Sequence, residues 1–279
     1  MKKQLLRKTL IIALVFISGF AYSQEAVMLK YDFVKGKNYV QNTQVTQNVT
    51  QTMGGREMKI LAEVKLDNEF SVESVEKDVS ATVLVSVPGF SVHSSAMGKD
   101  TTMNFKDLKD KSRVTFSLTG KSLSSEKVDS SDVSKVIGQI DFAKLRILPG
   151  KSVRVGEKWQ DKTVESKKGS GSPFATENTS DIEYTLVGKE VRDGKEYYKI
   201  SYTGDITING KGTQMGMEMF IEGTGKSEGF FCFDPKMSMV VYTEDNTELD
   251  MTVAVSGQQN MTIPMTQSIK TIVKFEEKI

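Results

Sequence analysis

Methionine is the one enriched side chain in this sequence that carries a distinctive chemistry. The chain contains 14 methionines, and one apolar stretch alternates three of them with other residues before an isoleucine: Met215, Met217, Met219 and Ile221. Period-two spacing places these four side chains on one face of a β-strand. Because flexible thioethers adapt to varied apolar ligands, we interpret the four residues as candidates for lining a ligand site. Cu(I) coordination and simple core packing are the alternatives.

Catalysis by a nucleophile and a base finds little support, because the chain holds one histidine and one cysteine. His93 follows a β-like stretch and is typical of a partly exposed histidine. Cys232 lies in the apolar run 229–233, which indicates a buried, inert thiol. The sequence lacks the H-E-x-x-H pattern. The glycine-rich stretches 204–216 and 223–225 are predicted to be turns and bulges, since no helix follows them to bind phosphate. We expect a protein without catalytic activity, cofactor or metal.

The first 23 residues have the pattern of an export signal. Four basic residues precede an apolar core over residues 10–20, and the small residues Ala21 and Ser23 mark a cleavage site. The apolar run is shorter than the roughly 18 to 20 residues that a membrane-spanning helix needs. The mature protein is therefore expected to begin at Gln24. Since no cysteine stands at this cleavage point, we expect an exported periplasmic or extracellular protein that is not lipid-anchored and has no transmembrane segment.

Charge gives no indication of a nucleic-acid partner. Removal of the signal would leave 33 Lys and Arg against 36 Asp and Glu, which is a net charge of −3. No polybasic stretch favours nucleic acid or a membrane surface. The remaining length suits one large β domain or two lobes with a substantial core.

Alternation of apolar and polar residues dominates the mature chain and predicts antiparallel β-sheet. The clearest runs cover residues 58–66, 81–87, 114–118, 215–221 and 249–255. Residues 39–52 are predicted to form a strand that is exposed to solvent on both faces. Turn chemistry separates such runs. The predicted turns are Gly54-Gly55, Asp193-Gly194, Asn209-Gly210 and Asp234-Pro235.

One helix and one loop interrupt this pattern. Helical spacing of apolar residues after Ser130 predicts a short helix over 131–146, ended by Pro149 and Gly150. Residues 167–173 are typical of a flexible loop. We therefore predict an all-β protein with two antiparallel curved-sheet or half-barrel lobes and one short helix. The predicted segments are a signal peptide (1–23), an N-terminal β lobe (24–125), a helical connector (126–147) and a C-terminal β lobe (148–279).

The stretch from residue 148 reads LPGKSVRVGEKW, so that a proline-led turn precedes a V-x-V-G-x-x-W pattern ending at Trp159. A G-x-G strand later runs into Phe233-Asp234-Pro235, and residues 31–39 read YDFVKGKNY. Together these patterns resemble an uncharacterised family of exported bacterial β-rich envelope proteins. The resemblance implies a fold and a compartment, and it implies no activity. Trp159 itself is predicted to anchor the core.

Two functions fit these observations. The first is a non-catalytic binding protein for an apolar or amphipathic, lipid-like envelope molecule. The second is a structural or interaction protein that docks on another envelope protein through its strand edges. A carrier would leave apolar surface free for its ligand, whereas a docking protein would present an exposed edge or patch. The sequence does not indicate the oligomeric state.

Overall fold

The structure is a computed structural model that describes residues 26–130, 144–168, 174–214, 216–257 and 260–278. The predicted signal peptide and Met215 lie outside these residues, as does most of the predicted helix and of the predicted 167–173 loop. Lys167 and Lys168, which the loop prediction included, belong to a strand. The described residues contain no helix, so the predicted short helix is not confirmed.

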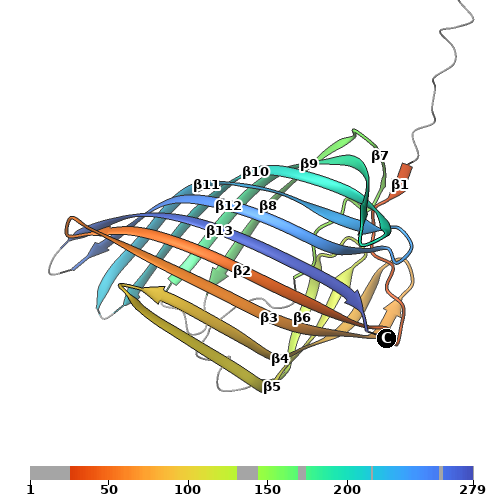
Figure 1. Cartoon of the computed structure of the whole chain (residues 1–279), viewed down its shortest axis with the longest axis horizontal. Coiled ribbons are helices and arrows are strands. Elements are labelled where there is room, and N and C mark those ends of the chain that lie inside the picture. Colours follow the sequence, from red (N-terminus) through yellow and green to blue (C-terminus); the bar gives the residue numbers. More distant parts are fainter. Residues whose placement is uncertain (1–25, 131–143, 169–173, 215, 258–259, 279) are drawn as a thin grey trace, which may run out of the picture.

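The described chain forms two antiparallel sheets (Figure 1). A small sheet pairs β1 with β7, and a large sheet contains 11 strands in the order β6-β5-β4-β3-β2-β13-β12-β11-β10-β9-β8. The strands are β1 (Ala26–Met28), β2 (Asn38–Met53), β3 (Arg56–Glu76), β4 (Ser80–Ala96), β5 (Lys99–Ser117), β6 (Ser122–Asp129), β7 (Ser152–Arg154), β8 (Lys158–Lys168), β9 (Phe174–Arg192), β10 (Lys195–Gln214), β11 (Met217–Asp234), β12 (Met239–Ser256) and β13 (Met261–Glu277).

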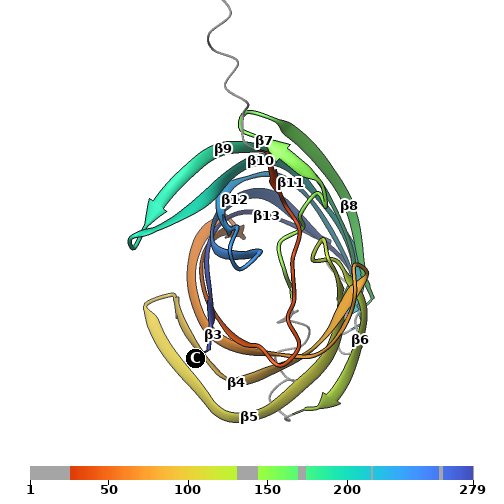
Figure 2. The same ribbon diagram turned by 90° about the vertical axis from the view of Figure 1, so that its right-hand side faces the viewer.

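One continuous sheet replaces the two predicted lobes. β2 pairs with β13 along most of its length, from Tyr39 opposite Glu277 to Gln51 opposite Met265. This pairing joins the N-terminal and C-terminal halves in the middle of the sheet. Its two edge strands, β6 and β8, are not paired with each other, so the sheet is open. The sheet is also strongly curved (Figure 2). The prediction of an all-β, curved, antiparallel architecture is confirmed, and the prediction of two lobes is wrong.

Most of the predicted turns are confirmed. Gly54-Gly55 joins β2 to β3, and Asp193-Gly194 joins β9 to β10. After β11, the Asp234 carboxylate caps its own turn by accepting hydrogen bonds from the backbone N–H groups of Lys236 (2.8 Å) and Met237 (3.1 Å).

The predicted Asn209-Gly210 turn is wrong, because both residues lie inside β10. There Gly210 pairs with Thr176 of β9 and Ile221 of β11. The stretch 223–225, predicted as a turn or bulge, likewise lies inside β11. The added Cβ of an alanine at position 223 would come within 2.5 Å of the Met251 side chain. Glycine at these positions therefore allows close packing against neighbouring strands and does not reverse the chain.

The large sheet is strongly curved, as Figure 2 shows. A single cluster of buried side chains includes residues from β2 to β5 and from β9 to β13, together with the segments around β1 and β7. We call the face that carries this cluster the concave face and the opposite one the convex face. Trp159 packs against the core cluster and stacks on Tyr184 with ring centroids 5.3 Å apart. The prediction that Trp159 anchors the core is therefore confirmed, although its side chain is only partly buried.

The core fills one end of the long strands, which we call the core end. The opposite end is formed by the hairpins β2–β3, β4–β5, β10–β11 and β12–β13, and we call it the distal end (Figure 1). Between the two ends, successive side chains of each strand continue to alternate between the concave and the convex face. In β11, odd-numbered residues share the concave face with Phe231, whereas the exposed Glu218, Glu222 and Lys226 lie on the convex face.

Cys232 is buried and unpaired, as predicted. Burial raises the pKa of its thiol to about 11, so almost no thiolate is available at neutral pH. We expect a thiol reagent at pH 8 to label the native protein very slowly and the protein in denaturant rapidly. Mass spectrometry of the labelled protein measures this difference. Fast labelling under native conditions would contradict the burial of the thiol.

Candidate functional site

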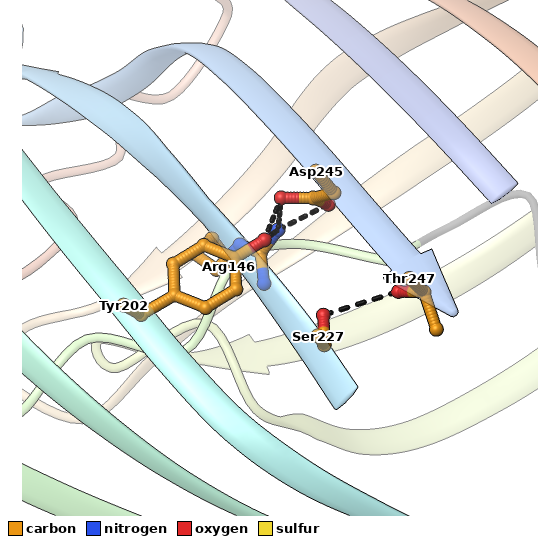
Figure 3. A network of polar contacts seen from close by, with 5 residues as sticks. All are labelled: Arg146, Tyr202, Ser227, Asp245 and Thr247. Carbon is orange, nitrogen blue, oxygen red and sulfur yellow. Dashed lines mark hydrogen bonds and ion pairs between the residues drawn. The ribbon is translucent and has the colours of Figure 1, made fainter. Parts of the chain in front are cut away.

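The side chains on the concave face change in polarity from the core end to the distal end. The apolar core occupies the core end. Next to it lies a group of polar side chains that we call the polar belt: Arg146, Tyr202, Ser227, Asp245 and Thr247 (Figure 3). The distal end carries apolar side chains and methionines that are partly exposed.

Arg146 and Asp245 form the centre of the polar belt. The Arg146 Nη2 atom donates to both carboxylate oxygens of Asp245, at 2.8 Å to Oδ1 and 2.6 Å to Oδ2. The Tyr202 hydroxyl donates to the same Oδ1 atom (Figure 3). The guanidinium group also lies over the rings of Tyr202 (4.9 Å) and Phe231 (5.9 Å). These contacts hold a charged pair on the concave face with several partners.

A glycine makes the contact between Tyr202 and Asp245 possible. Gly229 of β11 lies directly between them, because it pairs with Tyr202 of β10 and with Asp245 of β12. A Cβ atom at position 229 would come within 2.7 Å of the Tyr202 hydroxyl oxygen. The tyrosine ring therefore crosses the strand where no side chain obstructs it. Two residues further toward the distal end along each strand, the Thr247 hydroxyl donates to the Ser227 hydroxyl at 3.1 Å.

The segment 144–151 places Arg146 on the concave face. Leu145 and Leu148 of this segment are buried in the core. Its backbone is fixed by hydrogen bonds from Leu148 N to Thr119 O (2.9 Å) and from Gly150 N to Leu29 O (3.1 Å). The Tyr31 hydroxyl donates to the Arg146 carbonyl at 2.8 Å. Arg146 therefore belongs to a well-anchored segment.

Burial affects the pKa of Asp245 in the polar belt more than the attraction of Arg146 does. Burial raises the pKa of the Asp245 carboxyl, and the neighbouring Arg146 opposes this rise. Burial also raises the pKa of Tyr184, which lies beside Arg146. The Asp245 carboxylate accepts hydrogen bonds from both Arg146 and Tyr202.

The predicted ligand-lining residues lie at the distal end of β11. Met217 is exposed at the rim, next to the β10–β11 turn. Met219 and Ile221 are partly buried and pack against the buried residues Val253, Val255 and Ile263. Met215 lies outside the described residues. The shared face that the spacing predicted for Met217, Met219 and Ile221 is present, and their role in lining a ligand site stays a prediction.

Neighbouring strands extend this surface beyond the residues that sequence reasoning selected. Met251 of β12 pairs directly with Met265 of β13, and Met265 is followed by Gln51 of β2 and Met58 of β3 in the same cross-strand row. Met103 of β5 pairs with Val92 of β4, which faces the same side. Strand register brings these methionines together, so no local spacing could have revealed the group.

A Cu(I) site gains no additional ligand from this arrangement. In β11, Cys232 alternates with the core residues Phe231 and Phe233 and therefore faces the convex side. His93 likewise alternates with Val92, and its Nδ1 atom lies 3.0 Å from the Thr102 hydroxyl. Among the described residues no group of three or more His, Cys, Asp and Glu side chains could hold a metal ion.

Two hollows lie mainly on the convex face of strands β8 to β11. The larger, about 540 Å³, is polar and includes Asp181, Glu183, Asp205 and Glu228 among its lining residues. The smaller, about 380 Å³, includes Phe220, Ala175 and Lys211. Glu183 is paired with Lys158 at 2.7 Å, as is typical of a solvated strand face.

Comparison with known proteins gives a family match of limited extent. Residues 134–240 match the model of a family of unknown function (DUF6263), which is consistent with the resemblance to an uncharacterised family. The matched stretch runs from the connecting segment to the start of β12 and includes Arg146 and Tyr202. No curated protein matches the chain significantly.

Several solved structures are distantly similar. They include the COG4313 outer membrane channel from Pseudomonas putida F1, with 9% identity over 88% of this chain and 97% of that chain and a TM-score of 0.25. The translocator domain of the autotransporter NalP from Neisseria meningitidis has 8% identity over 87% of this chain and 90% of that chain and a TM-score of 0.21. At such TM-scores the similarity carries no argument about fold or function. The described residues include no helix with the length and apolar character required to cross a membrane.

Proposed function

We propose that this protein is an exported, non-catalytic binding protein that holds an apolar or amphipathic molecule of the cell envelope on the concave face of its large sheet. The observation that carries this proposal is the partial exposure of apolar side chains at the distal end. Met219, Met251 and Met265 face the same side as the core and yet remain accessible. Unbranched thioethers rearrange easily, so this surface suits ligands of varied shape.

The polar belt adds a second element of recognition. It lies between the core and the methionines, so a ligand lying along the strands would meet polar groups at one end and an apolar surface at the other. The Arg146 guanidinium and the hydroxyl groups of Ser227 and Thr247 can donate hydrogen bonds to a polar head. Such a division favours an amphipathic ligand. The basic start, apolar core and small-residue cleavage site of residues 1–23 support export.

Binding of a fluorescent fatty acid to the purified protein tests this proposal. We expect saturable binding that Met265→Gln weakens about tenfold, because the bound ligand would leave the new amide without hydrogen-bond partners. The free protein should lose little stability, since water reaches this side chain before the ligand binds. Titration of the fluorescence and a thermal melt measure the two effects.

Thr266→Gln is the matched control, because Thr266 is the exposed neighbour on the convex face. This variant should bind the fatty acid as the parent protein does. Absence of binding to the parent, or equal weakening by both substitutions, would contradict the proposal. Native mass spectrometry of protein purified from its own host would then identify any molecule that it carries.

A second candidate function, docking on an envelope protein, rests on the edge strand β6. All eight residues of β6 are exposed, including Leu123 and Val128. An exposed edge strand offers unpaired backbone groups to another chain. If docking is the function, cross-linking in the host should capture an envelope protein, and Val128→Lys should abolish that capture. Fatty-acid binding would be absent in this case.

A further inference from the structure

Methionine sulfur is concentrated at the distal end. Nine of the 14 methionines in the sequence lie on the distal halves of the strands or in the turns that join them. They are Met53, Met58, Met97, Met103, Met217, Met219, Met251, Met261 and Met265. Strand register places most of them on the concave face, across six different strands. This concentration is a property of the folded sheet.

Five of these side chains are exposed, and we call them the rim methionines. Their exposed fractions are 79% for Met97, 45% for Met103, 40% for Met53, 39% for Met261 and 37% for Met217. Met58, Met219, Met251 and Met265 lie further in and are partly exposed. Met239, in contrast, is fully buried in the core. At the distal end, an oxidant arriving from solvent therefore meets the rim methionines first.

The cysteine thiol does not compete with these thioethers. Cys232 is buried, and burial raises the pKa of its thiol to about 11, so the reactive thiolate is scarce. The thioether of methionine has no proton to lose and reacts at any physiological pH. Apart from Met28 of β1, which is 46% exposed, the most exposed of the described methionines lie at the distal end.

We propose that the rim methionines form a reversible oxidation site that controls the polarity of the distal end. The oxidant is a two-electron oxidant of the peroxide class. A lone pair on the methionine sulfur attacks one peroxide oxygen, the O–O bond breaks, and an S–O bond forms. The sulfur is oxidised by two electrons to a sulfoxide, and the other peroxide oxygen leaves as water after proton transfer.

The partner that this chemistry requires is a thiol-dependent methionine sulfoxide reductase. In the reverse step two thiols of the reductase are oxidised to a disulfide, the S–O bond breaks, and the oxygen leaves as water. Met97 lies in the β4–β5 turn, and Met53, Met217 and Met261 are terminal residues of their strands. These four side chains can therefore enter the active site of such an enzyme without unfolding. The backbone pairing of the sheet does not involve their side chains, so the fold survives both steps.

Oxidation should also change ligand binding, and this part rests on the proposed function. A sulfoxide replaces a flexible apolar side chain with a polar one. Five sulfoxides around the distal end would surround the apolar surface with groups that retain water. We expect fatty-acid affinity to fall by about tenfold, which corresponds to about 1.4 kcal/mol.

Limited peroxide treatment of the full chain followed by peptide mass spectrometry tests the oxidation site. We expect sulfoxide at the five rim methionines to form at least about ten times faster than at Met239, because buried sulfur reacts only after local opening. The melting temperature should remain nearly unchanged at this stage. Sulfoxide reductase with a dithiol should restore the original mass. Equal rates at Met239 and the rim, or unfolding at the first oxidation, would overturn the proposal.

Variants distinguish the effect of oxidation at the rim methionines from the effect of oxidation at other exposed methionines. Replacement of all five rim methionines by leucine removes the reactive sulfur while conserving volume, and binding in this variant should survive peroxide. Met97→Leu with Met103→Leu is a milder version in case the fivefold variant folds poorly, and it should protect binding in part. Met28→Leu is the control, because Met28 is exposed in β1 at the core end.

The two proposals fail in different ways. If untreated protein binds no fatty acid, the proposed binding function is wrong, and the order of sulfoxide formation still decides whether the rim is an oxidation site. If untreated protein binds and peroxide oxidises the rim without weakening binding, control of binding by oxidation is wrong. Equal protection of binding by Met28→Leu and by the fivefold variant would also contradict it.

Discussion

Replacing Asp245 with alanine should lower the free energy of unfolding by about 3 kcal/mol, because removing one partner leaves the other charge uncompensated in a partly buried site. The Arg146 guanidinium would keep its contacts with the rings of Tyr202 and Phe231 but lose both carboxylate hydrogen bonds. The Tyr202 hydroxyl would lose its acceptor as well. Urea unfolding followed by tryptophan fluorescence measures the loss, since Trp159 packs against the core.

A surface ion pair provides the matched control. Glu183 pairs with Lys158 at 2.7 Å between exposed side chains, and Glu183→Ala should cost less than about 1 kcal/mol. A double variant, Arg146→Met with Asp245→Leu, should regain much of the stability that Asp245→Ala loses, because no unpaired charge remains. If Asp245→Ala costs no more than Glu183→Ala, the polar belt does not anchor the segment 144–151 to the sheet.

Local patterns predicted the strands of this protein well. Side-chain alternation is a property of a single strand, so the runs 58–66, 81–87 and 249–255 identified parts of β3, β4 and β12 without any knowledge of their neighbours. The hairpin at Gly54-Gly55 is local in the same sense. The burial of Cys232 followed from its aromatic neighbours alone.

Long-range pairing explains what the sequence could not show. β2 and β13 are far apart in the sequence, and their pairing turns two predicted lobes into one sheet. The same argument applies at Asn209-Gly210, whose turn preference is overridden because the residues pair on both sides with β9 and β11. Local turn preference is weak compared with the loss of two sets of strand contacts.

The sequence predicted only part of the candidate site, because the rest of the site depends on long-range strand pairing. Spacing within one strand revealed Met217, Met219 and Ile221. Met251 and Met265 join them only through the register of β12 and β13. Arg146 and Asp245 are 99 residues apart in the sequence, and neither belongs to a pattern that marks a functional residue. Only the folded sheet brings this pair to the same face.

Gly229→Ala should lower the free energy of unfolding by about 3 kcal/mol, because the added Cβ has no room on the concave face. It would overlap the backbone carbonyl of Glu244 and approach the Tyr202 hydroxyl oxygen to 2.7 Å. Backbone cannot rotate away as a side chain can, so β12 would have to separate locally from β11. The Tyr202 ring would also be displaced from Asp245. Urea unfolding measures the loss of stability.

Glu228→Ala is the matched control for this substitution. Glu228 is the preceding residue of β11, and it is exposed on the convex face. Its replacement should change stability by less than about 0.5 kcal/mol. A similarly small effect for Gly229→Ala would mean that β11 and β12 can separate at this point without cost. In that case the absence of a side chain at position 229 would not be what lets Tyr202 cross the strand to reach Asp245.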